Sequence, residues 1–267
     1  MKTIWKTFMI SMFLIIICES SIFGQNKYNL SEFGHETVTF IKTPAGWDGY
    51  DWLTLGIVGG GTFVFYKFDV RIREQSYLAH PTFQNNRLME FGGQWGGFFV
   101  GPISCVVLYT IGSLANSNKT KKIGFEIGQA MLYSEVISFT SKTIIGRSRP
   151  FRGAGPNVFK PFSFLKSTLN SFPAGHADAA MAFSTVLAKN TDSYVLKVVA
   201  YIPAALCLVQ RVYSDNHWSS DVVISSALGY FVGNWVVNLH DRKESIVQVT
   251  SLYPLGLSVS LDKIGHK

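Results

Sequence analysis

Charged side chains are scarce in this sequence. Asp, Glu, Lys and Arg make up 15% of its 267 residues, whereas an ordinary soluble domain has about 25%. Hydrophobic residues reach 47% and aromatic residues 14%. This composition is more apolar than a soluble domain needs, so it indicates contact with a membrane. The length fits one large domain, and no change in composition marks a second.

Cysteine is also scarce. The chain has three cysteines: Cys18 in an N-terminal apolar run, and Cys105 and Cys207 inside later apolar segments. Three scattered cysteines do not build a zinc site. We therefore interpret Cys105 and Cys207 as small buried hydrophobic residues rather than as disulfide partners or metal ligands.

The sequence lacks a basic tract, although its formal net charge is +7. Its Lys and Arg residues are interleaved with apolar segments, and no nucleic-acid-binding motif is present. This pattern argues against a nucleic-acid partner. A phosphate-bearing small substrate or an anionic lipid surface is the better match for the excess positive charge.

The N-terminus has the three-part pattern of a secretory signal peptide. Lys2 and Lys6 precede an uncharged run over residues 7–18, and small and polar residues follow up to Gly24. We predict cleavage near Gly24, and the alternative is an uncleaved membrane anchor. A lipid-modified Cys18 is disfavoured because Ile17, which is not a small residue, precedes it.

Six long apolar segments follow, separated by short polar joints, and they predict an all-α helical bundle of about six core helices. They cover residues 53–66, 96–115, 123–145, 175–188, 198–210 and 222–239. Two of them, 96–115 and 222–239, approach the length of about 20 residues that a membrane span needs. The bundle is therefore either membrane-embedded or soluble.

The remaining segments have less regular patterns. Residues 71–90 predict a polar, partly helical connection, and residues 247–261 alternate weakly, as a terminal hairpin does. The expected domains are a signal peptide at 1–24, an N-terminal polar segment at 25–50, a helical domain at 51–243 and a C-terminal tail at 244–267.

Three clusters of polar residues stand at the ends of the predicted helices. In the first, Lys142 and Arg149 lie seven positions apart, so they share one helix face, and Pro150 follows. Two cations on one face suit an anion. The alternative is a basic helix end that interacts with the helix dipole.

The second cluster is Pro173-Ala174-Gly175-His176, directly before an alanine-rich helix. The start of a helix leaves backbone N–H groups free, which makes an anion-binding site, and His176 lies beside it. A histidine at this position can alternatively be a cap or an ordinary surface residue.

The third cluster contains Arg211, His217 and Asp221. His217 and Asp221 are four positions apart on the predicted helix, so the carboxylate can hold one imidazole nitrogen and leave the other free and more basic. A nucleophile or a general base requires that arrangement. The alternative is an ordinary histidine–aspartate pair on a helix surface.

In this order and with these spacings, the three clusters resemble the signature of the type 2 phosphatidic acid phosphatase family. That family shares its site with bacterial class A acid phosphatases and vanadium haloperoxidases. The resemblance covers about residues 52–239. Two positions depart from the usual pattern, because Ala174 and Gln210 stand where the family commonly has serine. The loss of a hydroxyl at Ala174 removes one potential phosphate donor.

The resemblance implies a role for each residue of the clusters. His217 is the nucleophile that becomes phosphorylated, Asp221 orients it, and His176 protonates the leaving oxygen and then activates water. Phosphate binding falls to a set of cations and backbone groups, namely Lys142, Arg149, Arg211, Gly175 and Ala174. In this scheme the three cations replace a metal ion, so neither a metal nor another cofactor is expected.

The implied substrate is a membrane lipid phosphate of the polyprenyl, lipid A or phosphatidyl type, cleaved as a phosphomonoester or a pyrophosphate. Two alternatives remain open: a broad-specificity soluble periplasmic acid phosphatase, and a non-catalytic phosphate-binding protein of the cell envelope. Ala174 favours the non-catalytic alternative, whereas the intact pair of His217 and Asp221 opposes it.

The number of membrane spans decides which side of the membrane carries the site. If residues 53–66 are too short to cross, the site faces the periplasm, and Lys119, Lys121, Lys122, Arg242 and Lys243 lie inside, as the positive-inside rule prefers. If all six segments cross, the site is cytoplasmic. We expect an inner-membrane protein of a bacterial cell envelope with a periplasmic site, and the alternative is a soluble or peripheral periplasmic protein.

Overall fold

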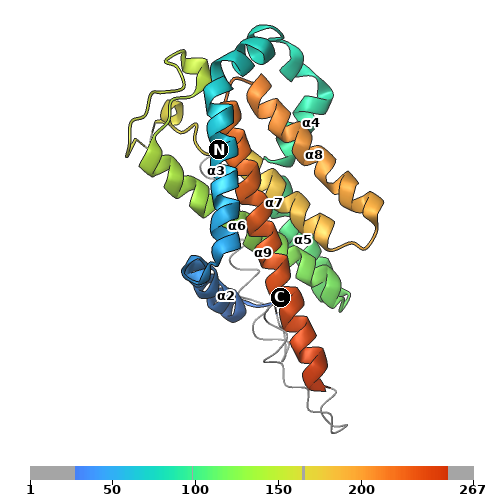
Figure 1. Ribbon diagram of the computed structural model, residues 1–267. Helices are drawn as coiled ribbons and strands as arrows, with labels where there is room; N and C mark the ends of the chain where they lie inside the picture. Colours follow the sequence, from blue (N-terminus) through green and yellow to red (C-terminus); the bar gives the residue numbers. More distant parts are fainter. Residues whose placement is uncertain (1–27, 98, 164–165, 252–267) are drawn as a thin grey trace.

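The computed structural model describes residues 28–97, 99–163 and 166–251, and within them the fold is all-α (Figure 1). Its α-helices are α2 (Leu30–Lys42), α3 (Gly49–Arg73), α4 (Arg87–Trp95), α5 (Val100–Leu114), α6 (Asn118–Ile145), α7 (Gly175–Lys189), α8 (Tyr194–Tyr213) and α9 (Ser219–Ser251). The β pairing in this part of the chain is one isolated bridge between Arg147 and Phe159. The predicted all-α class is confirmed.

Six of these helices, α3 and α5 to α9, correspond to the six predicted apolar segments. Two others were not predicted as core elements. Helix α2 lies in the segment expected to be merely polar, where Asn29 caps it by accepting a hydrogen bond from the Glu32 backbone N–H at 2.9 Å. Its Phe40 stacks on Tyr133 of α6, with ring centroids 4.4 Å apart. Helix α4 begins late in the expected connection and extends beyond it.

Helix α3 is much longer than the apolar segment at 53–66. It has 25 residues, because Asp48 and Asp51 form a capping box at its start and because the helix continues through charged residues as far as Arg73. At 1.5 Å per residue its length is about 37 Å. The helix is therefore longer than its apolar segment, but α3 is not among the helices that are long and apolar enough to cross a membrane.

The core is organised around α7, which contacts α6, α8 and α9. Apolar side chains from α6, α7 and α9 fill it, among them Ile127, Phe183 and Val236. Small residues bring α7 and α9 close together. At Gly229 of α9 a Cβ would lie 2.1 Å from the Asp178 carbonyl oxygen, so only glycine fits this crossing.

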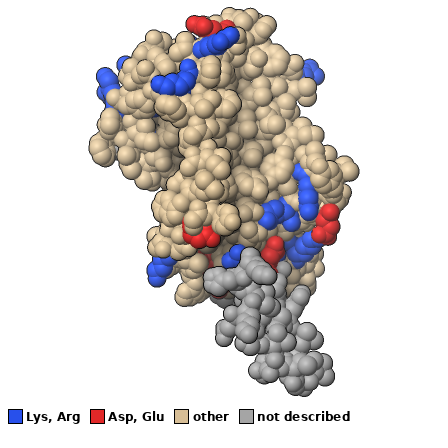
Figure 2. Space-filling model, viewed as in Figure 1, with Lys and Arg blue, Asp and Glu red and all other residues tan. Residues whose placement is uncertain are grey.

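Large apolar side chains also cover much of the outside. They project from α3, α5 and α8 and include Trp52, Ile57, Phe63, Ile103, Ile111, Val195 and Ile202. Figure 2 shows broad areas without charge on this face, with Lys and Arg gathered mainly toward the ends. By length and composition, α8 and residues Ser219–Lys243 of α9 can cross a membrane, and the pair α4 and α5, bent by 59°, could make a third span.

Two expectations concern the chain ends. The predicted signal peptide at 1–24 lies outside the described residues. Of the expected terminal hairpin at 247–261, residues 247–251 are the helical end of α9, and the rest also lies outside the described residues.

The helices bring particular chain segments to opposite ends of the bundle. The connection from α6 to α7 and the turn between α8 and α9 meet at one end, in the upper part of Figure 1, whereas α2 packs near the other end, beside the later part of α9. Helix α6 ends at Gly146, which has the left-handed φ of 60° and turns the chain into the connection.

Candidate functional site

The three predicted clusters meet at one end of the bundle. The His217 Nδ1 lies 2.6 Å from the Ser171 carbonyl oxygen, which joins the third cluster to the second. Lys142 of the first cluster lies against Gly175 of the second: a Cβ on Gly175 would be 3.0 Å from the lysine Nζ. Residues more than 70 positions apart in the sequence thus share one site.

His217 stands in the short turn between α8 and α9, and its side chain is buried. A carbonyl oxygen only accepts hydrogen bonds, so the contact with Ser171 requires that His217 Nδ1 carries the hydrogen. The lone pair of the neutral ring is then on Nε2. Burial lowers the pKa of His217 well below its usual value, and the nearby Arg149 and Lys142 lower it further. The ring is therefore uncharged and able to act as a nucleophile.

Asp221 does not hold His217 directly, contrary to the expectation from their spacing. Its carboxylate accepts hydrogen bonds from the Ser171 hydroxyl at 2.5 Å, from an Arg147 guanidinium N–H at 2.5 Å and from the Trp218 backbone N–H at 3.0 Å. Asp221 is the third residue of α9, so it turns back to satisfy the free N–H at the helix start, as in a capping box. It reaches His217 only through Ser171.

The three cations of the site have neutral hydrogen-bond partners. Arg149 donates to the side-chain oxygens of Asn170 and Asn216, at 2.8 and 3.1 Å. The Arg211 Nε donates to the Gln210 side-chain oxygen at 2.6 Å, and the Lys142 Nζ donates to the Ser138 hydroxyl at 2.8 Å. The amide partners orient Arg149 and Arg211 without cancelling their charge, so the charge of these two residues remains available to an anion.

Arg147 contrasts with these cations. It lies inside the first motif, but no sequence pattern singled it out as a site residue. It is buried, and its guanidinium donates to Asp221 at 2.5 Å, to Asp69 of α3 at 2.7 Å and to the Ser220 hydroxyl at 2.8 Å. Asp69 also accepts from the Ser219 hydroxyl at 2.7 Å. This network fixes the start of α9 and thereby the position of His217 beside it.

His176 is the second residue of α7, and it faces the same cations. Its pKa falls to about 4, because the ring is mostly buried and because Arg211, Lys142 and Arg149 repel a positive charge. Gly175 precedes it at the point where any side chain would meet Lys142. The α7 N-terminus has no side-chain cap, and the polar character of this end is suited to an anion.

Ala174 packs into the apolar core beside the site. Its backbone N–H donates to the Ser225 hydroxyl at 2.6 Å, and its side chain is fully buried beside Ala177 and Val222. That Ala174 binds phosphate stays a prediction, and the hydrogen bond to Ser225 competes with it. The sequence could not show this, because it did not reveal that Ser225 of α9 satisfies this N–H.

Two acidic residues beside Lys142 were also missed. The Glu135 carboxylate lies 3.6 Å from the Cβ position of Gly175, and Asp178 is fully buried one turn along α7. Burial raises the pKa of both carboxyl groups, while Lys142 lowers it. Their spacing was the available clue, since Glu135 precedes Lys142 by two helical turns and Asp178 follows His176 by two positions.

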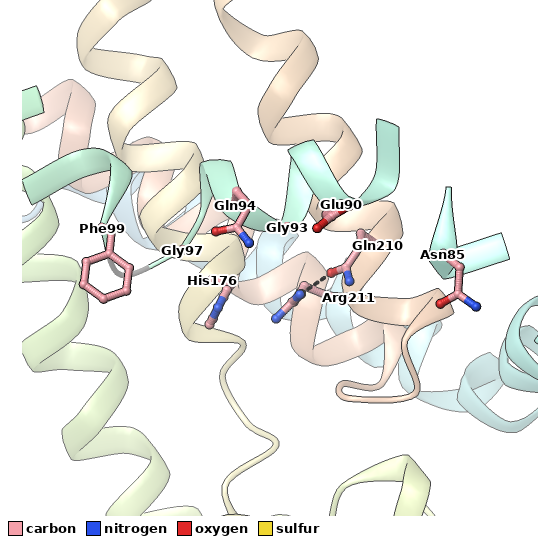
Figure 3. Close-up of a pocket in the computed structure, with 9 residues that line it drawn as sticks. All are labelled: Asn85, Glu90, Gly93, Gln94, Gly97, Phe99, His176, Gln210 and Arg211. Carbon is pink, nitrogen blue, oxygen red and sulfur yellow. Dashed lines mark hydrogen bonds between the residues drawn. The ribbon is translucent and has the colours of Figure 1, made fainter. Parts of the chain in front are cut away.

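A cavity of about 630 Å³ opens beside His176 and Arg211 (Figure 3). The other residues that line it are Asn85, Glu90, Gly93, Gln94, Gly97, Phe99 and Gln210. Most of these come from α4 and the residues around it, and two of them, Asn85 and Glu90, fall in the segment that had been expected to form a connection. The cavity is polar and reaches two of the groups predicted to act on phosphate, His176 and Arg211.

The segment that contains the three clusters is similar to a known protein family. The family model of the PAP2 superfamily matches residues 124–245, which include all three clusters. The resemblance inferred from the spacing of Lys142, His176 and His217 is thereby confirmed.

Two curated relatives and one solved structure are similar to the chain. A Sulfolobus acidocaldarius protein named undecaprenyl-diphosphatase is 27% identical over 60% of this chain and 71% of its own length. A Rhizobium etli protein named lipid A 1-phosphatase is 33% identical over 49% of this chain but only 56% of its own. The crystal structure of Aquifex aeolicus LpxE has 20% identity and a TM-score of 0.42, covering 57% of this chain and 83% of that one.

Proposed function

We propose that this chain is a phosphatase that removes phosphate from a membrane lipid through a phosphohistidine on His217. The observation that carries the proposal is the setting of the His217 ring. Its Nδ1 is fixed by the Ser171 carbonyl, and Lys142, Arg149 and Arg211 stand near enough to affect its charge. The family match and the names of the relatives, which act on lipid phosphates, support the same function.

In the first step, the Nε2 lone pair of His217 forms a bond to phosphorus while the bond between phosphorus and the leaving oxygen breaks. His176 donates its proton to that oxygen. The three cations stabilise the negative charge on the equatorial phosphate oxygens, as preorganised charges do in other phosphoryl transfers. Asp221 acts as a positioning residue, because it holds Ser171 and Ser171 holds His217.

In the second step, His176 accepts a proton from water, and the water oxygen attacks phosphorus. The bond between phosphorus and Nε2 breaks, phosphate leaves, and His217 is again neutral. His176 has a low pKa in the free protein. The negative charge of a bound phosphate raises that pKa, so the substrate itself helps to charge the general acid.

A lipid substrate matches the surface of the molecule. Two helices can cross a membrane by length and composition, and exposed apolar side chains line α3, α5 and α8. The chain is therefore membrane-associated, and its site lies at one end of these helices, where a phosphorylated headgroup would meet it.

The test is phosphate release by the full-length protein purified in detergent. We expect release from lipid phosphates and persistence of that release in EDTA. His217→Ala should lower kcat/KM by roughly 10⁴-fold or more, whereas the control His80→Ala, at an exposed position, should leave it unchanged. Acid-labile label from the substrate should appear on His217, and label on a serine or undiminished activity in His217→Ala would refute the mechanism.

We further propose that the site faces the periplasm. Support comes from the opposite end of the bundle, where Lys121 and Lys122 begin α6 and Lys243 lies on α9, because lysines that flank membrane helices favour the cytoplasmic side. In intact cells, a membrane-impermeant maleimide should label Phe162→Cys, an exposed position near the site, and not Lys119→Cys at the other end. The reverse pattern would place the site in the cytoplasm.

A further inference from the structure

The general acid indicates where the leaving group must lie. His176 gives its proton to the leaving oxygen in the proposed reaction, so the group attached to that oxygen lies on the His176 side of the phosphate. The cavity opens on that side, since His176 and Arg211 line it together (Figure 3). Its volume of about 630 Å³ is ample for a sugar or a glycerol unit.

Helix α4 forms the wall of this cavity opposite the histidine. Glu90 and Gln94 are four positions apart, so they share one helix face, and both line the cavity. Tight packing keeps α4 in place: at Gly96 a Cβ would lie 2.0 Å from the His176 carbonyl oxygen, and at Gly93 it would lie 3.3 Å from an Arg211 guanidinium nitrogen. Helix α4 also lies outside residues 124–245, so the family match does not account for this wall.

The lining has a definite chemical character. Three of its side chains, Asn85, Gln94 and Gln210, are amides, which both donate and accept hydrogen bonds and so suit hydroxyl groups. The charged side chain that α4 adds is the carboxylate of Glu90, which accepts from hydroxyls and repels an anion. A diphosphate substrate would place its second, anionic phosphate in this cavity.

We propose that this cavity is the leaving-group subsite and that Glu90 and Gln94 select a neutral, hydroxyl-bearing leaving group, a sugar or a glycerol, over an anionic one. This inference rests on the proposed phosphatase function. It makes Glu90 and Gln94 specificity-determining residues: their hydrogen bonds favour hydroxyls, and the charge of Glu90 disfavours a phosphate leaving group.

The experiment compares two substrates on the full-length protein in detergent: a lipid-linked sugar 1-phosphate and a polyprenyl diphosphate. The quantity measured is the ratio of their kcat/KM values at low and high ionic strength. Glu90→Gln should shift this ratio toward the diphosphate by about threefold, and less at high salt, because an exposed charge is screened. Gln94→Ala should lower kcat/KM for the sugar phosphate more than for the diphosphate.

A matched control is Asp192→Asn, which removes an exposed carboxylate between α7 and α8, at the end of α7 remote from His176. Its ratio should equal that of the unmodified protein. An unchanged ratio in both Glu90→Gln and Gln94→Ala would overturn the subsite while leaving the phosphatase intact. Absence of phosphate release from every lipid phosphate by the unmodified protein would overturn the proposed function and the subsite with it.

Discussion

The two ends of the bundle each bury a histidine among charged groups, but they partner it in opposite ways. At the α2 end, both ring nitrogens of His240 face carboxylates: Nδ1 lies 3.0 Å from Glu126 and Nε2 lies 3.1 Å from Glu36. Lys243 and Gln129 each donate to Glu36 at 2.8 Å. Each charge there has a partner of opposite sign or a hydrogen bond within the protein.

At the site end, the histidines stand beside cations. Nδ1 of His217 contacts a neutral carbonyl, and the hydrogen-bond partners of Arg149 and Arg211 among the described residues are amides. Burying positive charges close together raises the free energy of the unliganded protein, because the charges repel each other. A bound anion would relieve this repulsion. A self-neutralised cluster of charges ties helices together, whereas a cluster with uncompensated positive charge is suited to bind an anion.

Disrupting the His240 cluster at the α2 end should lower the stability of the protein and leave its activity unchanged. His240→Leu leaves Glu36 and Glu126 buried without their histidine partner, and we expect the free energy of unfolding to fall by about 3–5 kcal/mol. The activity per folded molecule should not change. Denaturant unfolding in detergent and phosphate release measure the two quantities, with the exposed His80→Leu as control. A selective loss of activity would mean that this network is coupled to the site.

Removing a cation at the site end should lower the activity and leave the stability nearly unchanged. Arg149→Gln removes one uncompensated cation, so kcat/KM should fall by about 10²–10³-fold. Stability should hold or rise slightly, because a repulsion with Arg211 disappears. Arg152→Gln, three residues on and exposed, is the matched control and should keep full activity. If Arg149→Gln unfolds the protein instead, its charge is structural and the contrast between the ends fails.

Ala174→Ser tests whether position 174 contacts phosphate or only packs against its apolar neighbours. Ala174 is buried beside Ala177 and Val222, so a hydroxyl there lacks a polar environment, and stability should fall by about 1–3 kcal/mol. We expect no gain in kcat/KM. The measurements are thermal unfolding and phosphate release on lipid and soluble phosphates. A several-fold rise in kcat/KM would show that position 174 does reach phosphate.

The pH dependence of kcat/KM tests how the cations affect the protonation of His176. Because burial and Arg211 lower the pKa of His176 to about 4, the acid form needed in the first step is scarce at pH 7 and grows as pH falls. The value of kcat/KM should therefore rise by up to about tenfold per unit from pH 7 to pH 5. The pKa of His217 is also lowered by its burial, which favours the neutral ring. His176→Gln should flatten the profile, and a rate that instead increases with pH would contradict this assignment.

Interactions local in sequence were the predictable part of the site. His176 and Gly175 could be assigned to a helix start from Pro173 and the alanines that follow. The prediction that Lys142 and Arg149 share one helix face is wrong, because α6 ends at Ile145 and Arg149 has an extended backbone in the connection that follows. Asp221 shows the limit of such reasoning. Its four-residue spacing from His217 allowed a direct bond, but the free N–H of Trp218 and the guanidinium of Arg147 compete for the same carboxylate, and they prevail.

The sequence alone determined the helical class, the six apolar core segments and the residues of the three clusters, because helix periodicity and cluster spacing are local properties of the chain. The tertiary structure decided which charges are neutralised. Asp69 meets Arg147, Ser171 meets His217, and α4 closes a cavity over His176. These pairings join residues far apart in the chain, and packing density, rather than any local pattern, brings them within hydrogen-bond distance.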